Sequence, residues 1–125
     1  MKRLRVLVVD DCTDLAHDWA RVIKRWGHDV TVATEGLAAL RAAASGIFDA
    51  AVLDIDLPGM NGFDLAEALR EQPGHETIHL IAATGRLDME ARQRAMAIGF
   101  QHYLTKPIAA NELMGVLQAH TEVTG

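Results

Sequence analysis

The sequence has a single cysteine, Cys12, among 125 residues, and this scarcity excludes an internal disulfide framework. Half of the residues are hydrophobic, yet no uninterrupted apolar stretch approaches the length needed to cross a bilayer. No signal segment opens the chain, because the apolar run Val6 to Val9 leads directly into acidic residues. We therefore expect a soluble, cytoplasmic protein that does not enter a membrane. We also expect Cys12 to be a buried or half-buried small residue, since neighbouring carboxylates disfavour a thiolate.

Positive charge is also scarce. The formal net charge of -5 at pH 7 argues against nonspecific binding of nucleic acid, so any effect on DNA is expected to be indirect. The histidines have neither metal-ligand spacing nor the context of a phosphodonor; they are His17, His28, His75, His79, His102 and His120. The length fits one domain with its own core.

Strand-like runs alternate with helical patterns along the whole chain. Five of each predict an α/β fold, with a doubly wound five-stranded parallel sheet and five helices. The first strand, Leu4 to Val9, is almost continuously apolar, as expected when helices cover both faces. In the second strand Val30 and Val32 alternate with polar residues, which predicts an edge strand.

The helical patterns carry start and stop signals. In the first helix Thr13 is a candidate N-cap, Gly27 a candidate left-handed terminator, and Trp19 and Trp26 are expected to anchor the core. The second helix is expected over Glu35 to Ser45, with Leu37, Leu40, Ala44 and their neighbours facing inward. The other helices are expected over Gly62 to Glu71, over Asp88 to Ile98, and after Pro107.

Chemically versatile side chains follow four of the predicted strands. The strand-end residues are Asp10 and Asp11, Asp54, Thr84 and Lys106. Carboxyl ends of parallel strands meet at one edge of an open sheet, which is where such sheets bind ligands. Three acids, a hydroxyl and an ammonium brought together there predict a place for a divalent metal and a phosphoryl group.

The three aspartates favour a hard cation. Asp10, Asp11 and Asp54 would repel one another and raise their own proton affinity unless a cation intervenes. With oxygen ligands only, Mg²⁺ or Mn²⁺ is favoured over zinc, and a shallow site that keeps waters suits Mg²⁺. For Asp10, a role as a helix or turn cap stays open beside the metal role. A carboxylate can also attack phosphorus to form an acyl phosphate, and Asp54 is the predicted nucleophile.

Together, Asp10-Asp11, Asp54, the Leu57 to Gly62 loop, Thr84 and Lys106-Pro107 resemble the receiver domain of two-component response regulators. The resemblance spans essentially the whole chain and implies a flavodoxin-like, CheY-like fold. It also implies that residues 1–125 form a single receiver (response regulatory) domain without an output domain. The implied function is a phosphorylation-dependent signalling switch, not a turnover enzyme.

The resemblance also assigns roles to residues. The implied metal ligands are Asp10, Asp11, Asp54 and the main-chain carbonyl of Asp56. Asp54 is the implied phosphoacceptor, Thr84 and Lys106 bind the phosphoryl oxygens, Thr84 and Tyr103 form the switch, and Asp56 and Arg86 modulate phosphoryl lifetime. The Lys106–Pro107 bond is implied to be cis, and Lys106 is expected to follow a central strand.

The phosphoryl source and the output are expected to lie in other proteins. The implied donor is a sensor histidine kinase or a histidine phosphotransfer protein. The output partner is expected on the surface of the fourth helix, last strand and fifth helix. Both a single-domain response regulator and a receiver cut from a longer protein remain open.

Two other functions compete with this interpretation. Asp54-Ile55-Asp56 resembles the nucleophile motif of haloacid-dehalogenase-type phosphatases, but there the nucleophile follows the first strand, whereas here an acid pair precedes it. A flavodoxin-like binding module is permitted by the fold. However, the acidic Cys12-Thr13-Asp14 segment lacks the Ser, Thr and Gly residues expected around a flavin phosphate.

Overall fold

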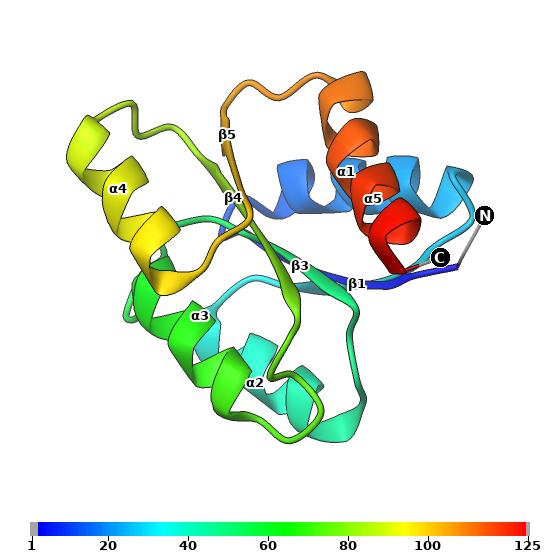
Figure 1. Ribbon diagram of the computed structural model, residues 1–125, viewed down its shortest axis with the longest axis horizontal. Helices are drawn as coiled ribbons and strands as arrows, with labels where there is room; N and C mark the ends of the chain where they lie inside the picture. The colour runs from blue at the N-terminus through cyan, green and yellow to red at the C-terminus, as the bar shows by residue number, and fades with distance from the viewer. Residues whose placement is uncertain (1–2, 125) are drawn as a thin grey trace.

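A computed structural model describes residues 3–124, with side chains described up to residue 119. Strands and helices alternate without exception over this range (Figure 1). The strands are β1 Arg5–Val9, β2 Asp29–Ala33, β3 Ala50–Leu53, β4 His79–Thr84 and β5 His102–Thr105. The helices are α1 Thr13–Arg25, α2 Gly36–Ser45, α3 Gly62–Glu71, α4 Met89–Ile98 and α5 Ala110–Thr124.

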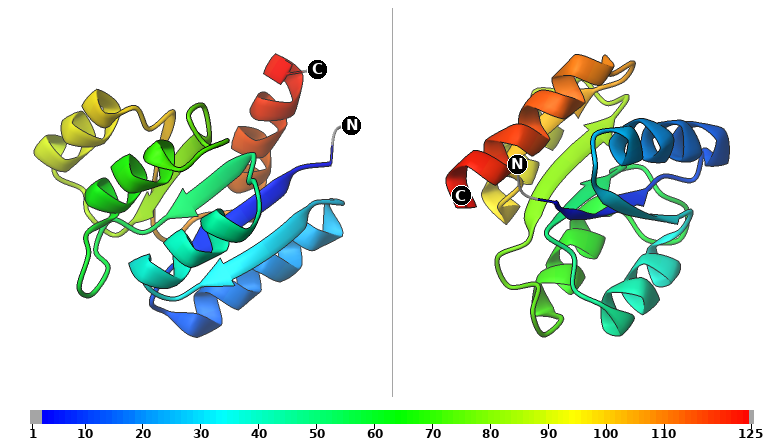
Figure 2. Two further views of the ribbon diagram at one scale, coloured as in Figure 1. Left: turned by 90° about the horizontal axis from the view of Figure 1, so that it is seen from below. Right: turned by 90° about the vertical axis from the view of Figure 1, so that its right-hand side faces the viewer.

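The five strands form one parallel sheet in the order β2-β1-β3-β4-β5. The arrowheads drawn in Figure 2 accordingly point toward one edge of the sheet. The predicted fold class is confirmed, and so is the edge position of β2. The expectation that Lys106 follows a central strand is wrong, because β5 is the outermost strand on the side opposite β2. A run of only four residues, His102–Thr105, is too short to show the alternation that distinguishes an edge strand from a central one.

Helices cover both faces of the sheet and bury a core on each (Figure 1). On one face, Trp19 and Ile23 of α1 and Leu113 of α5 pack with residues of β1. On the other, α2, α3 and α4 cover a core that includes Phe63 and Phe100, whose rings meet edge to face with centroids 6.5 Å apart. Within residues 3–124, no helix is both long and apolar enough to cross a membrane.

The start of α1 differs from the prediction. Cys12, not Thr13, is the N-cap, and it makes no side-chain capping hydrogen bond. Its amide instead donates to the Asp10 carboxylate at 2.9 Å, so the loop is shaped by that acid. The Cys12 side chain is exposed, which corrects the expectation of a buried or half-buried residue. The chain therefore turns at Cys12 because Asp10 holds its amide.

The buried face of α2 also differs from the prediction. Gly36, Ala39 and Ala43 are buried, whereas Leu37 is 59% exposed and Ala44 is also exposed. A Cβ atom at Gly36 would lie 2.9 Å from the sulfur of Met60, so the helix packs closely against the Met60 side chain there. Of the three residues named in the prediction, only Leu40 packs against the core, while the buried positions are those of their neighbours.

The loop that follows Asp54 returns tightly onto the start of α3. The Gly62 amide donates to the Ile55 carbonyl at 2.7 Å. A Cβ atom at Gly62 would lie 2.4 Å from the Asp54 carbonyl oxygen and 2.7 Å from the Ile55 Cα, both of them backbone atoms. Gly62 is thus required sterically, and it fixes the path of the loop beyond Asp54.

We expect Gly62→Ala to destabilise the protein by about 1–3 kcal/mol, because backbone atoms must move to admit the methyl group. The matched change Gly115→Ala, in α5, meets no atom within 4 Å. It should stabilise the protein by about 0.5–1 kcal/mol through helix propensity. Urea unfolding measures both, and equal effects of the two changes would contradict the steric argument.

Candidate functional site

The predicted strand-end acids meet at the carboxyl edge of the sheet. Beyond the strands, the Asp54 amide donates to the Val9 carbonyl at 2.9 Å and the Asp10 amide to the Ala33 carbonyl at 3.2 Å. Asp10 is fully buried, Asp54 is 6% exposed, and Asp11 is exposed. Asp10, Asp11 and Asp54 each offer a carboxylate oxygen, and these oxygens lie within 4.8 Å of one another.

Each buried carboxylate has one oxygen held by the backbone. Asp10 Oδ1 accepts from the Cys12 amide at 2.9 Å, and Asp54 Oδ1 accepts from the Asp56 amide at 3.0 Å. In both residues Oδ2 is the atom that contacts the Lys106 ammonium. The backbone thereby orients the carboxylates so that their remaining oxygens converge on a cation.

Lys106 reaches the acids from the end of β5. Its Nζ lies 2.6 Å from Asp10 Oδ2 and 3.1 Å from Asp54 Oδ2. Its amide donates to the Thr84 carbonyl at 2.8 Å, and the Lys106–Pro107 bond is cis, as the resemblance implied. The ammonium also lies 5.8 Å from the ring of Trp19 in α1, a contact that sequence reasoning missed. Lys106 therefore joins β5, the acids and α1.

The surroundings shift the pKa of both partners. Burial raises the pKa of the Asp54 carboxyl, against the lowering effects of the Asp56 amide hydrogen bond and of Lys106. Burial by itself would lower the pKa of Lys106, but the hydrogen bonds and charges of Asp10 and Asp54 outweigh it and raise that pKa. Lys106 thus stays charged, and added positive charge at the site would favour the ionised, nucleophilic form of Asp54.

Thr84 and Tyr103 lie on neighbouring strands beside the acids. Thr84 is fully buried, and its hydroxyl accepts from the Arg86 amide at 3.3 Å. The Tyr103 hydroxyl donates to the Arg86 carbonyl at 2.9 Å, so its ring is already directed toward the loop after β4. Burial raises the pKa of the Tyr103 phenol. The structure therefore connects the two predicted switch residues through the backbone of Arg86.

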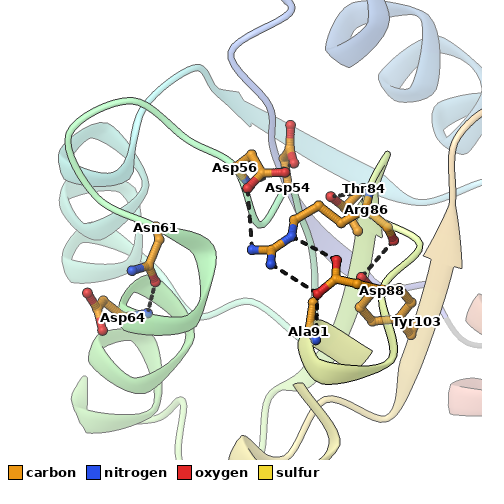
Figure 3. Close-up of polar contacts among 9 residues, drawn as sticks. All are labelled: Asp54, Asp56, Asn61, Asp64, Thr84, Arg86, Asp88, Ala91 and Tyr103. Atoms are coloured by element: carbon orange, nitrogen blue, oxygen red, sulfur yellow. Dashed lines mark hydrogen bonds and ion pairs between the residues drawn. The ribbon is translucent and has the colours of Figure 1, made fainter. Parts of the chain in front are cut away.

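The side chain of Arg86 lies between two carboxylates (Figure 3). Its Nη1 is 3.7 Å from Oδ1 of Asp56, the other residue that the resemblance implied to modulate phosphoryl lifetime. Its Nε and Nη2 lie 3.2 and 3.1 Å from the two oxygens of Asp88. The contact with Asp88 was missed, because sequence identified Asp88 only as the start of a helix.

The donor set fits a hard divalent cation. Asp10, Asp11 and Asp54 supply carboxylate oxygens alone, which Mg²⁺, Mn²⁺ and Ca²⁺ prefer, and no histidine or thiolate joins them in the part of the chain described. The Lys106 ammonium already occupies a position between Asp10 and Asp54, which demonstrates that these carboxylates converge on positive charge. The position of the Asp56 main-chain carbonyl relative to a metal stays a prediction.

A doubly wound sheet with acids and a lysine at its carboxyl edge defines a CheY-like protein. The family model for the response regulator receiver domain matches residues 6–118. The chain therefore belongs to the response regulator receiver family. The general function of that family is to accept a phosphoryl group on an aspartate, and membership implies histidine kinases as partners.

Several proteins of known sequence are similar. An uncharacterised 14.6 kDa protein of Leptolyngbya boryana is 35% identical over 120 residues, which cover 96% of this chain and 92% of that protein. The transcriptional regulatory protein TcrA of Mycobacterium tuberculosis is 34% identical over 116 residues. That match covers 93% of this chain but 45% of TcrA, so the chain spans about half the length of such regulators.

Solved structures agree on the fold. The chemotaxis protein CheY4 of Vibrio cholerae superimposes with a TM-score of 0.89 at 28% identity, covering 94% of this chain and 98% of that one. The receiver domain of the sensor histidine kinase PA1611 of Pseudomonas aeruginosa gives a TM-score of 0.84 at 26% identity, covering 94% and 97%. That structure has a magnesium ion coordinated in its active-site cleft. These matches favour a receiver over the phosphatase alternative.

We expect Lys106→Met to destabilise the protein at pH 7 by about 1–3 kcal/mol, because two buried carboxylates would lose their cation. The loss should be smaller when the same change is made in an Asp54→Asn background, where one carboxylate is already neutral. Urea unfolding of the unaltered chain, the two single variants and the double variant gives the coupling free energy between Lys106 and Asp54. Equal losses in the two backgrounds would show that Lys106 does not balance the charge of Asp54.

Proposed function

We propose that this chain is a phosphorylation-dependent signalling switch whose phosphoacceptor is Asp54. The observation that carries the proposal is the convergence of Asp10, Asp54 and Lys106 around one position at the carboxyl edge of the sheet. The nucleophile, the cation and the acid cluster that aspartyl-phosphate chemistry needs are together there.

The chain's own residues account for most of the transfer step. An Asp54 oxygen attacks the phosphorus of a phosphohistidine or small phosphodonor; the new P–O bond forms as the bond to the donor breaks, and the leaving group takes up a proton. Lys106 then moves from the Asp54 carboxylate to the phosphoryl oxygens as a point charge. The Thr84 hydroxyl has one donor available for a phosphoryl oxygen while it accepts from Arg86.

The cofactor proposed for the site is Mg²⁺, with Mn²⁺ as a substitute. Asp10, Asp11, Asp54 and the main-chain carbonyl of Asp56 would hold it. A bound divalent ion would supply positive charge that offsets the charge of the transferring group. The carboxylate cluster supports this assignment.

The proposal also covers the domain organisation, the location and the partners of the chain. Residues 1–125 would form one receiver domain that acts in the cytoplasm and catalyses only its own phosphorylation and dephosphorylation. The phosphoryl group would arrive from a sensor histidine kinase or a histidine phosphotransfer protein. The net charge of -5 supports a role without direct contact to nucleic acid or membrane.

Output is proposed to use the face made by α4, β5 and α5, with Thr84 and Tyr103 as the switch. Three large apolar side chains on α4 or just before it support this choice: Leu87 is 81% exposed, Met89 69% and Met96 53%. Large exposed apolar patches mark interaction sites, and these three side chains lie on or next to one helix. The chain is thus proposed to present a partner surface whose shape depends on Thr84 and Tyr103.

The primary test is phosphorylation. With Mg²⁺ and a small phosphodonor, intact-mass analysis should show one added phosphoryl group, and peptide mapping after reduction of the acyl phosphate should place it at Asp54. EDTA should abolish the modification. Asp54→Asn should lose it, whereas Asp64→Asn, an exposed acid in the first turn of α3, should keep it. Full labelling of Asp54→Asn would reject the assignment.

Arg86 is proposed to prolong the life of the phosphoryl group by narrowing the access of water between Asp56 and itself. We expect Arg86→Ala to accelerate the decay of phosphorylated Asp54 while barely changing the melting temperature, since the pair is exposed. Decay is followed after removal of the phosphodonor. Arg41→Ala is the matched control, because Arg41 also lies 3.7 Å from an acid, Glu35. An unchanged rate in Arg86→Ala would contradict the shielding role.

A further inference from the structure

The Arg86 guanidinium contacts acids in two segments that the proposed switch must connect: the start of α4 and the loop after β3. Toward α4, Nε and Nη2 form a fork on the two Asp88 oxygens at 3.2 and 3.1 Å. Toward the loop after β3, Nη1 lies 3.7 Å from Asp56, two residues beyond Asp54 (Figure 3). The shorter contacts place the guanidinium mainly on Asp88.

Besides its ion pair with Arg86, the Asp88 side chain makes a second interaction. Its side chain caps α4, and Oδ2 accepts from the Ala91 amide at 3.1 Å. That same oxygen lies 3.1 Å from Arg86 Nη2. The cation that reaches toward the phosphoacceptor loop is therefore hydrogen-bonded to the residue that starts the helix.

The backbone of Arg86 is held while its side chain is exposed. The amide donates to the Thr84 hydroxyl at 3.3 Å, and the carbonyl accepts from the Tyr103 hydroxyl at 2.9 Å. The side chain is 41% exposed. A change of partner by the guanidinium consequently requires rotation of side-chain bonds and no displacement of the strand.

We propose that Arg86 is a shared cation that couples the occupancy of Asp54 to the first turn of α4. The inference rests on the proposed function: a phosphoryl group on Asp54 draws the guanidinium from Asp88 toward the site. Such a group carries nearly two negative charges and three acceptor oxygens, which suit the arginine fork better than one carboxylate does.

The exchange changes the proposed output surface directly. Leu87 and Met89 flank Asp88 in sequence and are 81% and 69% exposed. Once Arg86 leaves, Asp88 keeps its bond to the Ala91 amide but loses the fork that ties it to the loop after β4. The first turn of α4 then loses this side-chain restraint. Because coupling is reciprocal, Asp88 must in turn weaken binding at Asp54.

This reciprocity gives a double-mutant test with beryllium fluoride as the phosphoryl mimic. Asp88→Asn keeps the N-cap, since asparagine caps as well as aspartate, but removes the charge that competes for Arg86. In the presence of Mg²⁺ and at low ionic strength, it should tighten beryllium fluoride binding about two- to fivefold. In an Arg86→Ala background the same substitution should change the affinity by much less. Titration followed by ¹⁹F NMR measures all four dissociation constants.

Glu90→Gln is the matched control, because Glu90 is an exposed acid in the same first turn of α4. It should leave the affinity within error of the unaltered chain. The Ala91 amide should shift on beryllium fluoride binding in the unaltered chain and not in Arg86→Ala.

The outcomes separate the two proposals. Binding that requires Asp54 but is unaffected by Asp88→Asn would overturn the coupling and leave the proposed function standing. An equal gain in affinity from Asp88→Asn with and without Arg86 would also overturn the coupling. The gain would then come from removing a negative charge near the site, and not from releasing Arg86. Failure of the unaltered chain to bind beryllium fluoride would overturn the proposed function and this inference with it.

Discussion

The carboxyl edge of this sheet depends on one ammonium group. Asp10 is fully buried and Asp54 nearly so, and two neighbouring buried carboxylates are unfavourable without positive charge. Within residues 3–124, Lys106 is the cation that pairs with both. Removing Lys106 would leave these carboxylates without their cation, so its contacts hold together a site whose acids would otherwise repel each other. Under the proposed function, these are also the contacts that a phosphoryl group on Asp54 would rearrange.

The parallel sheet explains how one lysine serves acids from two other strands. β1, β3 and β5 all end at the same edge, and the Lys106 amide bonded to the Thr84 carbonyl sets where the side chain begins. The ammonium at the end of that side chain lies 5.8 Å from the Trp19 ring. Trp19 belongs to the core beneath α1. The position of the catalytically useful charge is therefore linked to the packing of a helix distant from β5 in sequence.

The sequence allowed prediction of those features that depend on the local pattern of apolar and polar residues. Polar residues directly after apolar runs placed Asp10, Asp54, Thr84 and Lys106 at one edge, since parallel strands leave no other arrangement. It failed where a distant contact decides the outcome. Leu37 is exposed while Gly36 packs against Met60, and Cys12 caps α1 because Asp10 holds its amide. Asp88 was recognisable as a helix start, but its fork with Arg86 depends on the course of the loop after β4, which no periodicity encodes.

The two cations near Asp54, Lys106 and Arg86, differ in burial. This difference suits them to different roles. The Lys106 side chain is 22% exposed and pairs with buried acids, so desolvation and close contacts confine it to the site. Arg86 is 41% exposed, and its acidic partners Asp56 and Asp88 are 57% and 47% exposed, so solvent weakens each of its contacts. Weak, exposed contacts allow a small change of charge nearby to redistribute a side chain among its partners. We propose that the strongly held lysine provides the charge for chemistry, and that the weakly held arginine changes partner when Asp54 is phosphorylated.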